Sequence, residues 1–123
     1  MRALQYFLLS ALFVSLMSGE ALAGSGRIKS SEVTALLVDD TDFGGCMIEL
    51  SNGPEAVLGD CGGDWVTLDC LAAFPESTKS NASQKFSQGQ LALVMNNKVR
   101  VYITNDRKAN GFCFATRIDI IAK

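Results

Sequence analysis

The chain has 123 residues, a formal net charge of −2, four cysteines and no histidine. Without histidine it lacks the Ser-His-Asp and Cys-His sets of nucleophilic catalysis and the mixed Cys/His zinc sites. A slightly acidic balance also disfavours nucleic acid as a partner, since nucleic-acid-binding domains present a basic surface.

Residues 1–23 predict a secretory signal peptide. Arg2 supplies a short positive start, residues 4–17 form an apolar run, and Ala21-Leu22-Ala23 gives the small-residue exit. The run is shorter than the roughly 20 residues of a membrane helix, so we expect no stable membrane insertion after cleavage. We expect a periplasmic or secreted protein whose mature part, residues 24–123, is a single domain.

All four cysteines lie in this predicted mature part, at Cys46, Cys61, Cys70 and Cys113. A domain of 123 − 23 = 100 residues has a marginal core. An even number of cysteines in a short exported chain predicts two disulfides, and the count alone allows three pairings. Zinc is the competing interpretation, but no Cys-x-x-Cys pair is present, so we expect neither a metal nor another cofactor.

Charge is divided unevenly along the mature chain. Residues 24–75 carry 2 cations and 9 anions, a net −7, whereas residues 76–123 carry 8 cations and 3 anions, a net +5. Opposite halves suggest charge pairing within the domain or between subunits. We favour a simpler interpretation, in which strands of both halves interleave and the charges average out over the surface.

Three strands are predicted before a helix. Residues 28–38 form a β-branched, aliphatic run that ends at the acidic segment 39–42. Three carboxylates within four residues could bind Ca²⁺, but the EF-hand spacing is absent and a solvated turn is the better interpretation. Residues 46–50 are the second strand, and the third, within residues 61–70, ends in a cysteine.

The third strand holds the chain's only tryptophan, Trp65. Alternation places Thr67 and Asp69 on the same face as Trp65, and Val66 and Leu68 on the other. Trp65 is therefore a candidate platform for ligand stacking, with a place at the edge of the core as the alternative.

A helix is predicted to follow Pro75. Hydroxyl residues within 77–80 can cap its start, and Asn96-Asn97 ends it. Gly89 costs roughly 1 kcal/mol relative to alanine in an exposed helix interior, so we expect a close approach of the helix to the sheet there. The apolar face at helical spacing consists of Ala82, Phe86, Gly89 and Leu93.

Two strands end the chain. Residues 99–104 alternate with period two, and residues 105–111 predict a turn in which Asn110-Gly111 supplies positive φ. Strict alternation in the last strand predicts two faces. One holds Phe112, Phe114, Thr116, Ile118 and Ile120, and the other holds Cys113, Ala115, Arg117 and Asp119.

These elements predict a mainly β fold with one helix (α+β). A helix between the third and fourth of five strands is the element order of the OB-fold, a small, partly open barrel. We therefore predict a five-stranded OB-like barrel over residues 24–123.

Several short motifs occur in the order of these elements. They are Gly26-Arg27-Ile28-Lys29, Cys46-Met47-Ile48, the strand ending in Cys70, Gln90-Leu91-Ala92-Leu93 and Val99-Arg100-Val101-Tyr102-Ile103. Together they resemble the B subunits of AB5 toxins of the subtilase-cytotoxin type. Residues 99–104 and 110–119 resemble, more closely, small exported proteins of Gram-negative bacteria that have no assigned activity.

The toxin resemblance implies an OB barrel, a ring-shaped homo-oligomer and recognition of surface glycans. The approach to the second strand departs from it. Residues 39–43 and two glycines stand where the toxin chains have a Ser-rich, aromatic segment, so no residue is carried over as a sugar ligand.

The OB arrangement also predicts how the cysteines pair. Its second strand runs antiparallel to the third and its fifth runs parallel to the third, which brings Cys46 near Cys70 and Cys61 near Cys113. We predict these two disulfides. A Cys61–Cys70 bridge would have to join two ends of one strand, about 30 Å apart.

No catalytic set is recognisable, so we expect no enzyme. The sequence has no Gly-x-Ser-x-Gly motif and no phosphate loop, and the cysteines are expected to be oxidised. Asp64 and Asp69 are five residues apart on a predicted strand and face opposite sides, which excludes them as a glycosidase pair.

We expect a non-catalytic binding module for a glycan or surface receptor. The alternative is a structural or protein-interaction protein of the bacterial cell envelope without a small ligand. Either could form a homo-oligomer. A basic face for nucleic acid could consist of Lys98, Arg100, Arg107, Lys108 and Arg117, but a solvated strand face is the better interpretation of this cluster. The candidate binding surface consists of Trp65, Arg100, Tyr102 and Arg117.

Overall fold

The computed structural model describes residues 24–122, and the predicted signal peptide lies outside the described residues. The domain is mainly β with one helix, as predicted. Within residues 24–122, no helix is long and apolar enough to cross a bilayer. The elements are β1 (Ser25–Val38), the 3₁₀ turn η1 (Phe43–Gly45), β2 (Cys46–Leu50), the 3₁₀ turn η2 (Pro54–Ala56), β3 (Trp65–Thr67), α1 (Lys79–Met95), β4 (Lys98–Ala109) and β5 (Phe112–Ile121).

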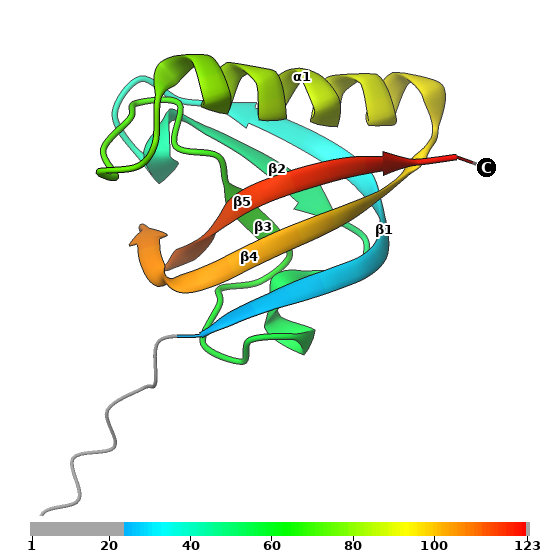
Figure 1. The fold of residues 1–123 in the computed structure, drawn as a ribbon, viewed down its shortest axis with the longest axis horizontal. Helices are drawn as coiled ribbons and strands as arrows, with labels where there is room; N and C mark the ends of the chain where they lie inside the picture. The colour runs from blue at the N-terminus through cyan, green and yellow to red at the C-terminus, as the bar shows by residue number, and fades with distance from the viewer. Residues whose placement is uncertain (1–23, 123) are drawn as a thin grey trace, which may run out of the picture.

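The five strands form one sheet that closes on itself in the order β1-β2-β3-β5-β4 (Figure 1). β2 is antiparallel to β3, and β5 is parallel to β3, which confirms the predicted strand directions. The long β1 pairs with β2 along its second half and with β4 along its first half. The predicted interleaving of the acidic and basic halves is wrong, because β1, β2 and β3 of the acidic half lie side by side and so do β4 and β5 of the basic half. The two halves meet where β1 pairs with β4 and β3 pairs with β5.

The core fills the inside of this ring, and α1 lies across it (Figure 1). A Cβ atom at Gly89 would lie 2.9 Å from Cγ2 of the buried Ile48, which confirms the close approach of the helix to the sheet. The predicted helix face is wrong at its end, because Ala92 is buried whereas Leu93 is 38% exposed. Buried aliphatic side chains of the core include Ile28, Val33, Ile48, Leu50, Val66, Leu68, Val99, Val101 and Ile103.

Both predicted disulfides are present. Cys46–Cys70 joins the start of β2 to the loop after β3, with a Cα–Cα distance of 5.5 Å. Cys61–Cys113 joins the segment before β3 to the start of β5, with a Cα–Cα distance of 5.3 Å. Both distances lie in the range that a disulfide requires.

Two element boundaries differ from the prediction. β3 ends at Thr67, because Asp69 has a φ of 57° and its buried carboxylate accepts hydrogen bonds from the backbone N–H groups of Ala73 and Phe74, which turns the chain. β4 continues through the predicted turn to Ala109, with an irregular register between Thr104 and Lys108.

Only Asn110 and Gly111 form the turn between β4 and β5. Both have positive φ, 52° and 84°, as the Asn-Gly signal predicted. The Asn110 side chain also accepts a hydrogen bond from the backbone N–H of Phe43, which ties this turn to η1.

Candidate functional site

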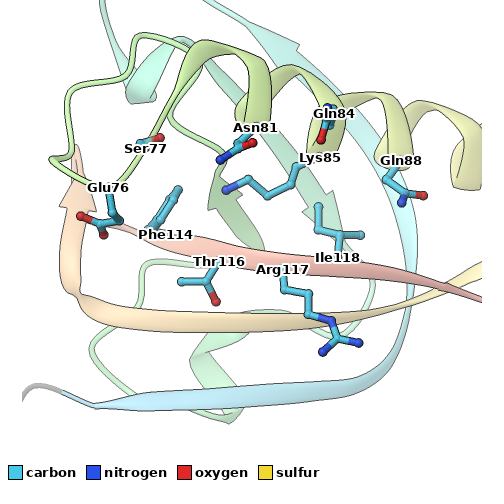
Figure 2. A pocket seen from close by; sticks show the side chains of 10 residues that line it. All are labelled: Glu76, Ser77, Asn81, Gln84, Lys85, Gln88, Phe114, Thr116, Arg117 and Ile118. Atoms are coloured by element: carbon cyan, nitrogen blue, oxygen red, sulfur yellow. The ribbon is translucent and has the colours of Figure 1, made fainter.

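A pocket of about 420 Å³ lies between the first half of α1 and β5 (Figure 2). Its volume is within the range of pockets that hold small molecules. The lining side chains come from α1 (Asn81, Gln84, Lys85 and Gln88), from β5 (Phe114, Thr116, Arg117 and Ile118) and from the segment before α1 (Glu76 and Ser77).

A β-bulge in β5 creates the wall of this pocket. Tyr102 of β4 lies opposite Arg117, and the next residue, Ile103, lies opposite Ala115, so Thr116 is the extra residue. A bulge of this kind bends the strand and changes which side chains face outward. The strict alternation predicted for the last strand is therefore wrong at Thr116.

The bulge brings polar and apolar side chains to one wall. Before it, Cys113 and Ala115 belong to the core, and after it the core residue is Ile118. Thr116 and Arg117 are consecutive and both exposed, which strict alternation does not allow. Figure 2 shows Phe114 and Ile118 of β5 directed toward α1, and Thr116 and Arg117 directed away from it.

Phe114 forms the apolar floor of the pocket. Its side chain is only 3% exposed and packs edge-to-face against Phe74, with 5.1 Å between ring centroids. Phe74 is held in place through its backbone N–H, which donates to the carboxylate of Asp69 at 2.9 Å. The buried carboxylate thus positions the floor of the pocket from outside it.

Lys85 lies between the helix and this floor. Its Nζ donates a hydrogen bond to the backbone carbonyl of Ala115 at 2.8 Å and lies 4.2 Å from the centroid of the Phe114 ring. Burial lowers the pKa of Lys85 from 10.5 to about 8, because desolvation outweighs the attraction of Asp69 and Glu76 for the charged form. Lys85 has no salt bridge to another residue of the 24–122 segment.

Three exposed amide side chains of α1 face the strand wall. Asn81, Gln84 and Gln88 are spaced three and four residues apart and therefore lie along one side of the helix. The helix starts at the N-cap Thr78, whose side chain accepts a hydrogen bond from the backbone N–H of Asn81 at 3.0 Å. Each amide side chain offers both donors and an acceptor to a ligand.

Three of the four residues predicted as a binding surface meet beside the pocket. The guanidinium of Arg117 lies 5.0 Å from the centroid of the Tyr102 ring, and its Nε donates to Asp119 at 2.7 Å. Arg100 lies 3.7 Å from the same carboxylate. The hydrogen bond and negative charge of Asp119 raise the pKa of Arg117.

The fourth predicted residue is placed differently. Trp65 lies on β3 opposite Glu49 of β2, is half-buried, and does not line the pocket. In the strand order, β5 separates Trp65 on β3 from Arg100 and Tyr102 on β4.

Sequence reasoning missed most of the pocket, including Lys85, Phe114 and the helix amides. One signal was present, because the amides at positions 81, 84 and 88 recur at helical spacing. Their partner wall depends on the bulge at Thr116, which no pattern in the sequence indicates.

The pocket lining offers hydrogen-bonding side chains and apolar side chains. In the part of the chain that the structure describes, no group of three His, Cys, Asp or Glu side chains could hold a metal ion. The acidic segment after β1 is a turn, in which the Asp39 carboxylate accepts hydrogen bonds from the backbone N–H groups of Thr41 and Asp42. These bonds lower the pKa of Asp39.

Compared with models of protein families, with curated proteins and with solved structures, the chain shows no match.

Proposed function

We propose that this protein is an exported, non-catalytic binding module that recognises glycans through the pocket between α1 and β5. The proposal includes an OB-like barrel, supported by a closed ring of five strands with the helix between β3 and β4. The two disulfides fit a periplasmic or secreted protein, since disulfides persist in oxidising compartments.

The observation that carries the proposal is the row of amides opposite an apolar floor. Sugars present closely spaced hydroxyl groups, each a donor and an acceptor, next to apolar C–H groups. Asn81, Gln84 and Gln88 match the hydroxyl groups, and the small exposed area of Phe114 and Ile118 offers an apolar contact the size of a methyl group. The pocket also carries Ser77 and Thr116, whose hydroxyl groups add further polar contacts.

A glycan array tests this function. The mature, oxidised protein is expected to bind a defined set of glycans, and a Gln84→Ala/Gln88→Ala variant is expected to lose at least tenfold in affinity. Gln90→Ala is the matched control, because Gln90 is an exposed amide of the same helix that does not line the pocket. An array without signal, or equal binding by all three proteins, would contradict the proposal.

A second function is favoured by an exposed apolar strip on α1. Leu91, Val94 and Met95 lie along one side of the helix and are 48%, 83% and 53% exposed. Such a strip suits a structural or protein-interaction role in the cell envelope, without a small ligand and without nucleic acid. In that case Val94→Ser would abolish cross-linking to an envelope protein, and the glycan array would stay blank.

A further inference from the structure

We infer that the pocket between α1 and β5 selects sugars that carry an acetamido group. The inference rests on the proposed glycan-binding function and names the chemical class of the ligand. Three properties of the pocket lead to it: the pairing of its charged residues, the position of Lys85 and the small accessible area of its apolar floor.

Two of the three charged residues of the lining are already paired. Glu76 and Lys85 contribute opposite charges to the lining, and Glu76 also forms an ion pair with Arg107. The third charged residue, Arg117, is paired with Asp119. Lys85 is thus the lining charge without an ion pair among residues 24–122, and its ammonium group can donate to an acceptor oxygen of a ligand.

Lys85 supplies a fixed donor beside the floor. An ammonium group has three N–H donors, and the bond to the carbonyl of Ala115 uses one of them. That bond and the contact with the Phe114 ring hold Nζ at a defined place in the lining. A carbonyl oxygen of a ligand is a suitable acceptor for one of the remaining N–H groups.

The apolar floor is too covered for a sugar ring to stack on it. Phe114 is 3% exposed and Ile118 is 6% exposed, and the Phe114 ring contacts both Lys85 and Phe74. Such a floor offers contact to a methyl group and excludes the flat face of a pyranose. An exposed aromatic ring, which unsubstituted hexoses would need for stacking, is absent from the lining.

An acetamido group matches these features together. Its carbonyl oxygen can accept from Lys85, its methyl group can contact Phe114 and Ile118, and its N–H can donate to the side-chain oxygen of Asn81, which lies next to the Lys85 amine (Figure 2). The ring hydroxyl groups of the same sugar can then bind Gln84 and Gln88. A sugar with a hydroxyl group in place of the acetamido group would lack the contacts with Lys85, Phe114 and Ile118.

Chitotriose and cellotriose provide a matched pair of probes. Both are β-1,4-linked trisaccharides, and they differ in having an acetamido or a hydroxyl group at C2. Isothermal titration of the mature protein is expected to show chitotriose binding at least tenfold more tightly than cellotriose. Lys85→Met keeps the apolar stem and is expected to lose that preference, whereas Lys79→Met, at an exposed position of the same helix, keeps it.

The outcomes separate this inference from the proposed function. Equal binding of the two trisaccharides, or a preference that survives Lys85→Met, overturns the acetamido inference and leaves glycan binding intact. No binding of either trisaccharide, with an array signal from other glycans, also overturns the inference alone. No binding of either and a blank array overturn both.

Discussion

Lys85 places a positive charge in a half-buried position, where it contacts Phe114 and the carbonyl of Ala115. Its burial lowers its pKa to about 8, so the protonated form is less stable in the folded protein than in the unfolded chain. A stabilising contact network would do the opposite. Burial of the charged amine of Lys85 therefore lowers the free energy of unfolding. Such a loss of stability is expected where the amine binds a ligand.

Because this loss of stability depends on the protonation of Lys85, the effect of Lys85→Met on the free energy of unfolding should depend on pH. Between about pH 8 and pH 10.5 the unfolded chain binds the lysine proton and the folded protein does not, so the wild-type free energy of unfolding gains a term that rises with pH. At pH 7 the variant is expected to be more stable by about 1 kcal/mol, less than the full shift implies because the side chain is half-exposed.

Urea denaturation of both proteins at pH 7 and pH 10 measures this difference. The advantage of Lys85→Met should shrink toward pH 10, and Lys79→Met should show no such trend. A variant that is less stable than the wild type at pH 7 would mean that the hydrogen bond to Ala115 and the contact with Phe114 outweigh desolvation.

Gly89 is a second residue with a defined role. Alanine would gain roughly 1 kcal/mol of helix propensity, but its Cβ would lie 2.9 Å from Cγ2 of Ile48, a fully buried side chain. Overpacking of a filled core costs about 1 to 3 kcal/mol. We therefore expect Gly89→Ala to destabilise the protein by about 1 kcal/mol.

Gly59→Ala is the matched control for this substitution, since a Cβ at Gly59 would have nothing within 4 Å. Thermal melts of the two variants compare them directly. A Gly89→Ala protein as stable as Gly59→Ala would show that α1 can move away from β2 at little cost.

At the scale of elements, local patterns predicted most of the fold. The bounds of β2 were predicted without error, and the end of α1 at Asn96 follows from a residue that tolerates the left-handed conformation, with a φ of 54°. The strand directions followed from element order, and the disulfide pairing followed from the strand directions. Each of these steps depends on local sequence or on a short list of topologies.

The predictions that were wrong, the end of β3 and the faces of β5, concern features that depend on tertiary contacts. β3 ends early because the carboxylate of Asp69 binds backbone N–H groups of the following loop. β5 changes face at Thr116 because its register with β4 shifts there. The alternation of apolar and polar residues along a strand predicts its two faces, but it does not predict where one strand of a pair has an extra residue.

The candidate site was harder to predict for the same reason. Arg100, Tyr102 and Arg117 lie close together because β4 pairs with β5, with Tyr102 opposite Arg117 and Arg100 opposite Asp119. The pocket needs α1 and β5 side by side and the bulge between them, which are tertiary features. In the sequence, nothing distinguishes Lys85 from an ordinary exposed lysine of a helix.

The two disulfides should differ in their contribution to stability. Cys61–Cys113 closes a separation of 52 residues and Cys46–Cys70 one of 24 residues. On the chain-entropy model the expected contributions are about 4 and about 3.5 kcal/mol. We expect the Cys61→Ala/Cys113→Ala protein to unfold at lower urea concentration than the Cys46→Ala/Cys70→Ala protein.

Denaturation of the two double variants, with the oxidised wild type as reference, checks this order. The reverse order would show that the Cys46–Cys70 bridge stabilises the folded loop after β3, beyond its effect on the unfolded chain. Phe74 of that loop packs against Phe114. Loss of the Cys46–Cys70 bridge would then also change the position of Phe114 in the pocket.

At the scale of the molecule, the exposed apolar strip of Leu91, Val94 and Met95 on α1 leads us to predict a homo-oligomer. Size exclusion with light scattering of the mature protein should give a mass of several chains. Val94→Ser should lower that mass, since Val94 is the most exposed residue of the strip. A monomer at high protein concentration would contradict the prediction.

The claim that glycans bind between α1 and β5 is tested most directly by NMR chemical-shift mapping. The mature, ¹⁵N-labelled protein would be titrated with the glycan that gives the strongest array signal. We predict shifts of the side-chain amides of Asn81, Gln84 and Gln88 and of the backbone amides of Thr116 and Arg117. Shifts confined to β2 and β3 around Trp65, the usual ligand face of OB barrels, would contradict the claim.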